Sequence, residues 1–412
     1  MQLKYQKLIQ EVIVITLDEA LNLIEQKVSL FYKNLNRIKK VKLMESLNYL
    51  TAEDIYSKYD IPEYDNSAMD GIAVSTIKEE YFLQDYTNNI LHNNAVEINT
   101  GQKIPDNTLT IIEKENYEII NNIAKIKDLN KVKPYKNIRK KGEEIKKGQL
   151  VINKNTLITP QVIGILAKIG MHKIKVFLPP RIGIIITGSE LVEIGTEKKD
   201  NQIFNSNGPL LISLLKQTFC TQNFHFSSPK LRSMINKYKL VEDNYKKIKS
   251  TIYKFLQNVD ILIITGGASV GKYDYSAKAL EDINAQKIFH KVSIKPGKPV
   301  YFYIYQNKLI FGFPGNPLAV FTLFHLFLKP TLKYFFTKKF DLNLIDVKNY
   351  EIVINEEFVK GSTNLDEKRI NIVPAFLSNY SIQAFPVGSN QLLPLINANC
   401  LLIIEKKKVI PI

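Results

Sequence analysis

The chain has 412 residues, of which 45% are hydrophobic and 23% are charged. This apolar content is high enough to build hydrophobic cores, so a mainly disordered chain is excluded. The length is too great for one ordinary core, and we expect about two to four domains. Cys220 and Cys400 are the only cysteines, which excludes a disulfide scaffold.

The net charge of +16 comes from 56 Lys and Arg against 40 Asp and Glu. The lysines are spread along the chain rather than set in one stripe with interleaved aromatic residues, so we expect no nucleic-acid partner. The longest strongly apolar run, residues 318–328, is far shorter than the roughly 18 residues of a membrane span. Residues 11–15 are too short for the core of a signal peptide. We therefore expect a soluble, cytoplasmic protein with no membrane partner.

Two helices are predicted from the signals at their ends. Thr16 is followed by Glu19 in the pattern of a capping box, and apolar residues then recur at helical spacing. A second helical pattern can be opened by Pro160 and stopped near Gly170.

Two other regions are rich in β patterns. Residues 60–150 contain short runs such as 109–112 and 119–123, with prolines between them, which predicts a small β domain. Residues 331–412 return to short β runs, so we expect a small C-terminal β domain as well.

From residue 180 onward, buried strand runs alternate with helical patterns. Residues 182–186, 259–264 and 309–311 are apolar runs, and each leads into a turn that contains glycine. Strand, glycine turn and helix in repetition are typical of a mostly parallel α/β sheet. Ligands on such sheets bind at the carboxyl ends of the strands, where these turns lie. Ser206 and Asn207 can cap one of the helices.

We therefore predict a multidomain α/β protein with a central, mostly parallel α/β domain. An N-terminal helical and β domain, an inserted small β domain and a C-terminal β-barrel-like domain accompany it. Residues 226–239 have the composition of an inserted surface loop. The predicted domains are residues 1–59 with 151–179, residues 60–150, residues 180–330 and residues 331–412.

A glycine-rich turn follows the second buried strand. Residues 266–272 match most of a phosphate-binding P-loop, but Tyr273 stands where that motif needs a Ser or Thr hydroxyl for Mg²⁺. The backbone N–H groups of such a turn suit an anion, and a plain tight turn is the alternative. Lys295 and Lys298 flank a Pro-Gly turn, where both ammonium groups could converge on one dianion. A solvated β-turn is the alternative there.

Further turns carry rigid or acidic residues. Pro314 and Pro317 enclose Gly-Asn in a rigid turn after the third buried strand, which suits a binding site. Scattered carboxylates can coordinate Mg²⁺ together with the phosphates of a ligand. The candidate carboxylates are those of Asp70, Glu190, Asp243 and Asp274.

Taken together, these motifs resemble the MoeA-type molybdopterin molybdenumtransferases, the family that includes the E domain of gephyrin. Each motif alone is weak, but their order matches the family from about residue 10 to the end of the chain. The matching stretches are 66–71, Thr100-Gly101 with Pro105, 139–144, 187–191, Ser206-Asn207, 265–271 with 273–275, 295–299, 314–317 and Gly388-Ser389.

The resemblance implies an elongated homodimer of four-domain subunits, with the active site between the α/β domain of one subunit and the N-terminal domains of the other. It implies insertion of molybdate into the dithiolene of adenylylated molybdopterin, with release of AMP and with Mg²⁺ as the cofactor. Since no adenylylating domain is fused here, the expected partners are a separate molybdopterin adenylyltransferase and acceptor molybdoenzymes.

The resemblance also implies roles for individual residues. Lys295 and Lys298 would attract and orient molybdate, and the glycine-rich turn with Ser269 would hold phosphates or the pterin. The expected catalytic residues are Asp70, Thr100, Glu144, Glu190, Asp243 and Asp274, of which Asp70, Glu190, Asp243 and Asp274 would bind the metal. The expected substrate-binding residues are Gly266, Gly267, Ser269, Gly271, Lys295, Lys298, Pro314, Gly315, Asn316, Pro317, Arg369 and Ser389.

The chain departs from the family pattern in places. Ser189 and Asn205 stand where the family usually has Asp, Glu144 replaces another Asp, and Pro374 stands where an arginine is common. Two other functions are alternatives. One is a P-loop nucleotide hydrolase, which Tyr273 disfavours, and the other is a non-catalytic scaffold, because a member of this family also serves in assembly.

Overall fold

The computed structural model describes residues 14–412 apart from 221–234, 267–273, 355–365, 367, 380, 386–387 and 389. The chain forms two compact units: unit 1 comprises Met1–Arg37 and Leu178–Ile412, and unit 2 comprises Ile38–Phe177. The predicted division into four domains remains a prediction. Within the described ranges, no helix is long and apolar enough to cross a membrane.

A six-stranded sheet forms the centre of unit 1, with strand order β17-β14-β18-β22-β21-β19. The first four strands are parallel, and the last two run antiparallel to their neighbours. The prediction of a mostly parallel sheet is therefore confirmed. The strands are β14 (Ile182–Thr187), β17 (Ile235–Val241), β18 (Ile261–Thr265), β19 (Gln286–His290), β21 (Tyr301–Tyr305) and β22 (Lys308–Phe313).

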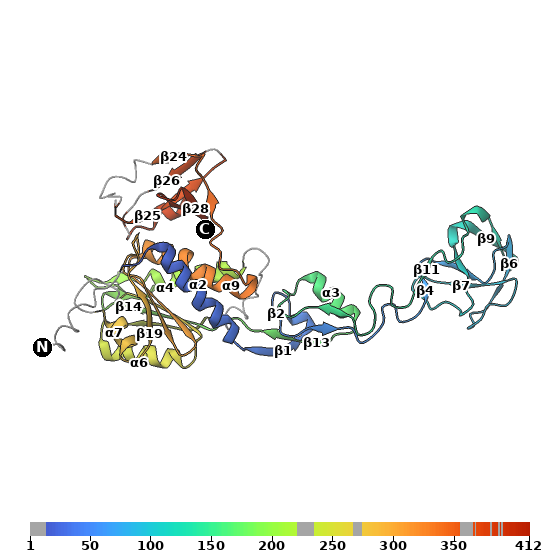
Figure 1. Ribbon diagram of the computed structural model, residues 1–412, viewed down its shortest axis with the longest axis horizontal. Helices are drawn as coiled ribbons and strands as arrows, with labels where there is room; N and C mark the ends of the chain where they lie inside the picture. Colours follow the sequence, from blue (N-terminus) through green and yellow to red (C-terminus); the bar gives the residue numbers. More distant parts are fainter. Residues whose placement is uncertain are drawn as a thin grey trace. The chain divides into compact units, whose positions relative to one another are not determined.

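Helices cover both faces of this sheet, with α6 and α7 on one side and α2, α4 and α9 on the other (Figure 1). The capping box predicted at Thr16 and Glu19 is present at the start of α2. α2 packs on α9, where the rings of Tyr32 and Tyr334 stack with centroids 5.6 Å apart. The helices are α2 (Leu17–Asn34), α4 (Asn207–Cys220), α6 (Tyr245–Leu256), α7 (Tyr275–Glu281), α8 (Pro317–Leu323), the π-helix η4 (Phe324–Leu328) and α9 (Lys329–Thr337).

One sequence prediction in this unit is wrong. Residues 235–239, expected to belong to an inserted surface loop, form most of β17, while 226–234 lie outside the described residues. Among the described strands, β17 pairs only with β14, at the edge of the sheet. Lysines such as Lys237 and Lys239 suit an edge strand, and they interrupt the apolar run by which a strand is predicted from sequence.

Six strands from the last part of unit 1, together with β20, form a seven-stranded sheet, in agreement with the predicted C-terminal β fold. A short two-stranded ribbon, β15 and β16, lies between β14 and α4 in the chain. These remaining elements of unit 1 are β15 (Leu191–Val192), β16 (Ile203–Phe204), β20 (Ile294–Lys295), β23 (Ile345–Asp346), β24 (Glu351–Ile354), β25 (Ile370–Leu377), β26 (Ser381–Ala384), η6 (Leu393–Ile396), β27 (Cys400–Ile403) and β28 (Lys408–Pro411).

Unit 2 contains the predicted β-rich segment, whose main sheet has the order β8-β5-β7-β6-β10-β9. The helix predicted at Pro160 is α3, which Thr159 caps. The elements are β1 (Ile38–Lys42), η1 (Leu43–Glu45), β2 (Leu50–Thr51), β3 (Ile55–Tyr56), β4 (Asn66–Ser67), β5 (Gly71–Val74), β6 (Glu80–Gln84), β7 (Asn94–Ile98), β8 (Thr110–Glu113), η2 (Lys114–Asn116), β9 (Tyr117–Ile120), β10 (Ile123–Ile126), η3 (Leu129–Lys131), β11 (Ile138–Arg139), β12 (Leu150–Ile152), α3 (Pro160–Lys168) and β13 (Lys173–Phe177).

The predicted β run at 119–123 is a hairpin rather than one strand. It holds the end of β9, a two-residue turn and the start of β10. Asn121 and Asn122 form the turn with φ values of 48° and 62°. Two central residues with positive φ are typical of the tight hairpin turn that matches strand twist, and asparagine tolerates this conformation.

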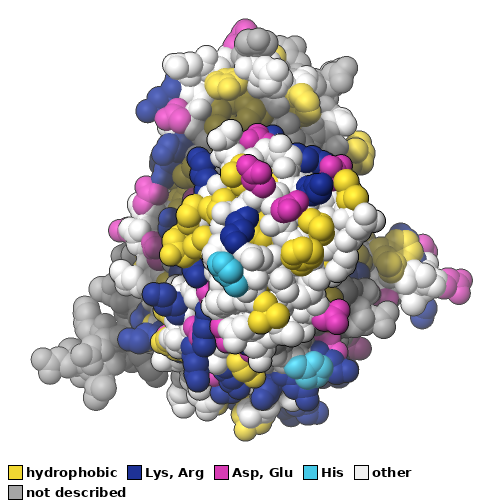
Figure 2. All heavy atoms as spheres, turned by 90° about the vertical axis from the view of Figure 1, so that its right-hand side faces the viewer, with side chains coloured by type: hydrophobic (Ala, Val, Ile, Leu, Met, Phe, Trp, Pro, Cys, Tyr) yellow, Lys and Arg dark blue, Asp and Glu magenta, His cyan; other side chains and the backbone are white. Residues whose placement is uncertain are grey.

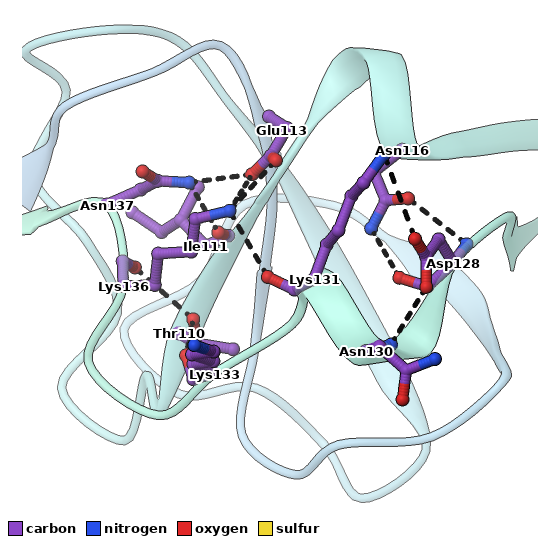
Figure 3. A network of polar contacts seen from close by, with 10 residues as sticks. All are labelled: Thr110, Ile111, Glu113, Asn116, Asp128, Asn130, Lys131, Lys133, Lys136 and Asn137. Atoms are coloured by element: carbon purple, nitrogen blue, oxygen red, sulfur yellow. Dashed lines mark hydrogen bonds and ion pairs between the residues drawn. The ribbon is translucent and has the colours of Figure 1, made fainter.

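Figure 3 shows a polar network in unit 2 around Glu113. Lys136 Nζ donates to both carboxylate oxygens of Glu113, at 3.0 and 3.2 Å, and Asn137 Nδ2 donates to Oε2 at 2.9 Å. Burial alone would raise the pKa of Glu113, but the hydrogen bonds from Lys136 and Asn137 outweigh it and lower the pKa below 4.5. The network therefore stabilises the ionised form of Glu113.

We expect Glu113→Gln to lower the stability of unit 2 by about 1 kcal/mol near neutral pH, because it weakens this charge-assisted contact. A carboxyl whose pKa is lowered on folding stabilises the fold above its ordinary pKa, and that contribution disappears as the pH falls through the lowered value. Thermal unfolding followed by circular dichroism should separate the two proteins more at about pH 7 than at about pH 3. Equal separation at both pH values would contradict this account.

The positive charge is dispersed on the face drawn in Figure 2. Lys and Arg side chains there are interspersed with acidic and apolar ones. Among the residues coloured in that view, no continuous basic stripe of the kind that tracks a nucleic-acid backbone is visible.

Candidate active site

A cavity of about 960 Å³ lies in unit 1 at the carboxyl ends of the parallel strands. The loops after β14, β17, β18 and β22 form it, together with the β15–β16 ribbon and the start of α4. This is the edge where open α/β sheets bind their ligands. The lining residues are Thr187, Gly188, Glu190, Leu191, Ile203, Phe204, Asn205, Ser206, Asn207, Asp243, Gly266, Tyr275, Pro299, Pro314, Gly315, Asn316, Pro317 and Asn390.

The structure brings several of the predicted site residues together at this cavity. Two carboxylates, those of Glu190 and Asp243, come from the loops after β14 and β17. Gly266 and the rigid turn 314–317 come from the ends of β18 and β22. Pro317, the last residue of this turn, is also the first residue of helix α8.

Gly266 stands at a close approach between two strand ends. It has a φ of +83°, and a Cβ built on it would lie 2.1 Å from the backbone oxygen of Thr187. Its own N–H donates to the oxygen of Phe313 at 3.2 Å. Only glycine fits this backbone conformation and this spacing, so the residue type here is set by local geometry.

Asp243 is tied to Ser189, one of the positions where the sequence departs from the family pattern. The backbone N–H of Ser189 donates to Asp243 Oδ2 at 3.3 Å, and the backbone N–H of Asp243 donates to Ser189 Oγ at 3.0 Å. The two loops at this edge are therefore joined by a reciprocal pair of hydrogen bonds. The backbone of residue 189 binds the Asp243 carboxylate, and the uncharged serine side chain binds the backbone N–H of Asp243.

Two buried polar atoms on the cavity wall have no hydrogen-bond partner among the described residues. Asn207 Nδ2 donates to the backbone oxygen of Gly315 at 2.7 Å, but Asn207 Oδ1 is unpaired among the described residues. Thr187 Oγ1, at the end of β14, is also buried without a hydrogen bond to any described residue. Buried polar groups are nearly always hydrogen-bonded, and an unpaired one costs about 1–3 kcal/mol. Both residues line the cavity, so these atoms would pair with a ligand once a small local shift of the wall uncovered them.

Four other predicted residues of unit 1 lie outside the described cavity lining. Asp274 caps α7, where its Oδ1 accepts hydrogen bonds from Ala277 N and Ser276 Oγ, both at 3.0 Å. Burial raises the pKa of Asp274 despite these bonds. Arg369 forms an ion pair with Asp366. Lys295 and Lys298 belong to β20 and to the turn that follows it.

The predicted residues of unit 2 form two separate groups. Asp70 accepts hydrogen bonds from the backbone N–H of Thr100 at 2.7 Å and from its hydroxyl at 2.9 Å, and these bonds lower the pKa of Asp70. Glu144 accepts from Lys168 Nζ at 2.5 and 2.7 Å and from Arg139 at 3.4 Å. The remaining predicted positions lie outside the described residues: Gly267, Ser269, Gly271 and Ser389.

Comparison with known families gives two matches that together span most of the chain. Residues 15–170 match the MoeA N-terminal region (domains I and II), and residues 183–334 match a "probable molybdopterin binding domain". A molybdopterin molybdenumtransferase of Staphylococcus epidermidis is 34% identical over 316 residues, which are 73% of this chain and 71% of the relative. The chain belongs to the MoeA family of molybdopterin molybdenumtransferases. A relative of the same name from Staphylococcus aureus is 32% identical over 71% of this chain and 70% of its own length.

Solved structures agree with this membership of the MoeA family. A molybdopterin biosynthesis MoeA protein from Pyrococcus horikoshii has a TM-score of 0.71 at 23% identity and covers 97% of both chains, which shows the shared fold. A second structure of that name from the same organism has a TM-score of 0.65 at 26% identity, covering 97% of this chain and 96% of its own. The predicted family and the predicted multidomain α/β architecture are thus confirmed. The family consists of transferases of molybdenum cofactor biosynthesis.

Sequence reasoning missed part of the cavity wall of this MoeA family member. Thr187 and Asn207 appeared only as parts of motifs, and Tyr275 and Asn390 were not assigned to the cavity lining. One signal was available: a threonine precedes the glycine turn at the ends of β14 and β18 alike. For Asn390, which reaches the cavity from the segment between β26 and η6, the only sequence signal was the neighbouring Gly388-Ser389 motif.

The donor set at the cavity fits Mg²⁺, the metal that the family resemblance implies, only in part. Among the described residues, no group of three or more His, Cys, Asp or Glu side chains is placed to hold a metal ion. Glu190 and Asp243 nevertheless both line the cavity. Mg²⁺ is often bound by one or two carboxylates plus phosphate oxygens of a substrate, so two carboxylates fit a metal that arrives with a phosphorylated ligand.

Proposed function

We propose that this chain inserts molybdate into the dithiolene of adenylylated molybdopterin and releases AMP. The observation that carries the proposal is the cavity at the carboxyl edge of the sheet, which is lined by two carboxylate residues and by two residues whose buried polar atoms have no partner among the described residues. The carboxylates suit a metal bound to phosphate, and the unpaired atoms suit a polar ring. Membership of the MoeA family supports both assignments.

Recognition of the pterin is assigned to the cavity wall. Asn207 Oδ1 can accept a hydrogen bond from an N–H or amino group, both of which a pterin carries. Thr187 Oγ1 can accept or donate, so it suits either edge of the ring. Because neither atom is satisfied within the described protein, each gains a bond when the ligand binds. These bonds would orient the ligand so that its phosphate reaches the carboxylates.

The chemistry is assigned to charged groups. Glu190 and Asp243 would hold Mg²⁺, which when bound neutralises phosphate charge during cleavage of the phosphoanhydride. The Ser189 pairing keeps the Asp243 carboxylate in place, because it accepts the backbone N–H of Ser189. Lys295 and Lys298 would attract the molybdate dianion. In unit 2, Asp70, Thr100 and Glu144 would contribute to the same reaction.

The setting of the reaction is part of the proposal. We propose a homodimer in the cytoplasm that receives adenylylated molybdopterin from a separate adenylyltransferase and passes the cofactor to molybdoenzymes.

Purified protein should be incubated with adenylylated molybdopterin, molybdate and Mg²⁺, and the product added to an apo-molybdoenzyme. Activation that requires all three components is the expected result. Activation that proceeds equally well without the protein would refute the proposal.

We expect Thr187→Val to bind adenylylated molybdopterin roughly three- to tenfold more weakly, because one ligand hydrogen bond is lost. The same change should stabilise the folded protein by about 1 kcal/mol, since it removes a buried hydroxyl without a partner among the described residues. Isothermal titration calorimetry and thermal unfolding measure the two effects.

Thr322 provides a matched control for this change. Its Oγ1 is also buried without a partner in the described part of the chain, but Thr322 lies in α8 and is not part of the cavity lining. Thr322→Val should raise stability to a similar degree and leave ligand affinity unchanged. If the Thr187→Val and Thr322→Val proteins bound the ligand with equal affinity, the proposed contact between Thr187 and the ligand would be wrong.

A further inference from the structure

At the cavity wall, a chain of hydrogen bonds runs from Asn205, one of the lining residues, to the edge strand β17. Asn205, just after β16, is only 1% exposed. Its Oδ1 accepts from the backbone N–H of Gly208 at 3.0 Å, in the first turn of α4. Its Nδ2 donates to the hydroxyl of Tyr238 and, at 3.4 Å, to Glu193 Oε1. Both ends of the Asn205 amide are therefore engaged by the protein.

Tyr238 connects the amide to the carboxylate. Its hydroxyl accepts the Asn205 amide and donates to Glu193 Oε1 at 2.8 Å. The space around this hydroxyl is tight, because a Cβ built on Gly208 would lie 2.5 Å from it. Burial, together with the neighbouring Glu193, raises the pKa of Tyr238 well above 10, so the hydroxyl keeps the proton that it donates.

The same elements carry residues that line the cavity. The backbone N–H of Asn205 donates to the oxygen of Val192 at 2.8 Å, and that of Ile203 donates to the oxygen of Glu190 at 2.9 Å. Asn207 follows Asn205 by two residues and opens α4. A change in the hydrogen bonds of Asn205 would therefore shift both the loop with Glu190 and the first turn with Asn207.

We propose that Glu193 and Tyr238 are positioning residues, which act through Asn205 to hold Glu190 and Asn207 at the ligand cavity. In this arrangement the carboxylate belongs to Glu193 and the amide belongs to Asn205. The inference rests on the proposed function, because it assumes that the cavity binds adenylylated molybdopterin. It assigns no ligand contact to Glu193 or Tyr238 themselves.

Removal of the Tyr238 hydroxyl tests whether Tyr238 positions the cavity residues through Asn205. Tyr238→Phe takes away the bond to Glu193 and one acceptor for the Asn205 amide, and we expect a roughly tenfold weaker Kd for adenylylated molybdopterin. Tyr303→Phe is the matched control, because the Tyr303 hydroxyl donates to Glu281 Oε1 at 3.2 Å and the residue is not part of the cavity lining. Both variants should lose thermal stability, but only Tyr238→Phe should lose affinity.

An exchange of the acid and the amide between positions 193 and 205 tests whether the hydrogen bond between these two side chains positions the cavity residues. Asn205→Asp alone puts two carboxylates within about 3.4 Å of each other, which disfavours both charges. In the double variant Asn205→Asp/Glu193→Gln, one acid and one amide are restored in reversed order, and the new carboxylate at position 205 can still accept from the backbone N–H of Gly208. We expect the single variant to bind roughly tenfold more weakly and the double variant to recover to within about threefold of wild type.

Calorimetric titration of the full-length proteins with adenylylated molybdopterin distinguishes the outcomes. Loss of affinity in Tyr238→Phe but not in Tyr303→Phe, with recovery in the double variant, is the expected result. Equal affinity of the two phenylalanine variants, or a double variant as weak as Asn205→Asp, would overturn the inference while leaving the proposed function intact. If the wild-type protein itself failed to bind, the proposed function would fall and the inference with it.

Discussion

Replacement of Gly266 by alanine is expected to lower the free energy of unfolding of unit 1 by about 3 kcal/mol. The same change is expected to reduce the rate of AMP release by roughly tenfold or more. The new Cβ would lie 2.1 Å from the backbone oxygen of Thr187, at a φ of +83° that L side chains rarely adopt. Relief of this clash must separate the ends of β14 and β18. Because Thr187 lines the cavity, the change would also move the atom that we propose to bind the ligand.

A control at Gly195 separates the cost of the positive φ from the cost of the clash with Thr187. Gly195 has a φ of +84°, and a Cβ built there meets no atom within 4 Å. Gly195→Ala should therefore carry only the penalty of the left-handed conformation, about 1–2 kcal/mol, with activity retained. Denaturant unfolding and AMP release measure the two responses. A Gly266→Ala protein that behaved like Gly195→Ala in both would show that the strand ends are not closely packed.

The combined substitution Glu190→Gln and Asp243→Asn is expected to reduce the rate of AMP release by roughly a hundredfold or more, because it removes the two carboxylates that would hold Mg²⁺ at the cavity. Stability should change by less than about 0.5 kcal/mol, since both side chains lie at exposed positions. Raising the Mg²⁺ concentration should restore part of the activity of each single variant.

Glu242 offers a control beside Asp243. Its carboxylate pairs with Lys247 at 2.5 Å and is not part of the cavity lining. Glu242→Gln should retain wild-type AMP release at every Mg²⁺ concentration. Should it lose as much activity as the double variant, the effect would belong to the general charge of this loop and not to the two carboxylates at the cavity.

Local patterns predicted much of the fold. The capping box at Thr16 and the proline at 160 mark helices that begin where the sequence indicates. The apolar runs at 182–186 and 259–264 correspond closely to β14 and β18, because strands buried on both faces need continuous apolar residues. Motif order then identified the family, since many weak signals in one order are specific together.

Other features depend on contacts that sequence spacing does not reveal. β17 was not predicted, because an edge strand can carry lysines along its length. The Asn121-Asn122 turn lies between isoleucines, so the sequence around it resembles one continuous strand. The positive φ values of the two asparagines form the hairpin turn. The unpaired state of Thr187 Oγ1 among the described residues and the link from Asn205 through Tyr238 to Glu193 arise only when separate elements pack together.

AMP release from adenylylated molybdopterin by the purified protein, with Mg²⁺ and with or without molybdate, tests the central claim most directly. The account predicts release that depends on molybdate and that is lost when Glu190 and Asp243 are both replaced by their amides. Tight binding of the substrate without release at any molybdate concentration would contradict it and would favour a scaffold function.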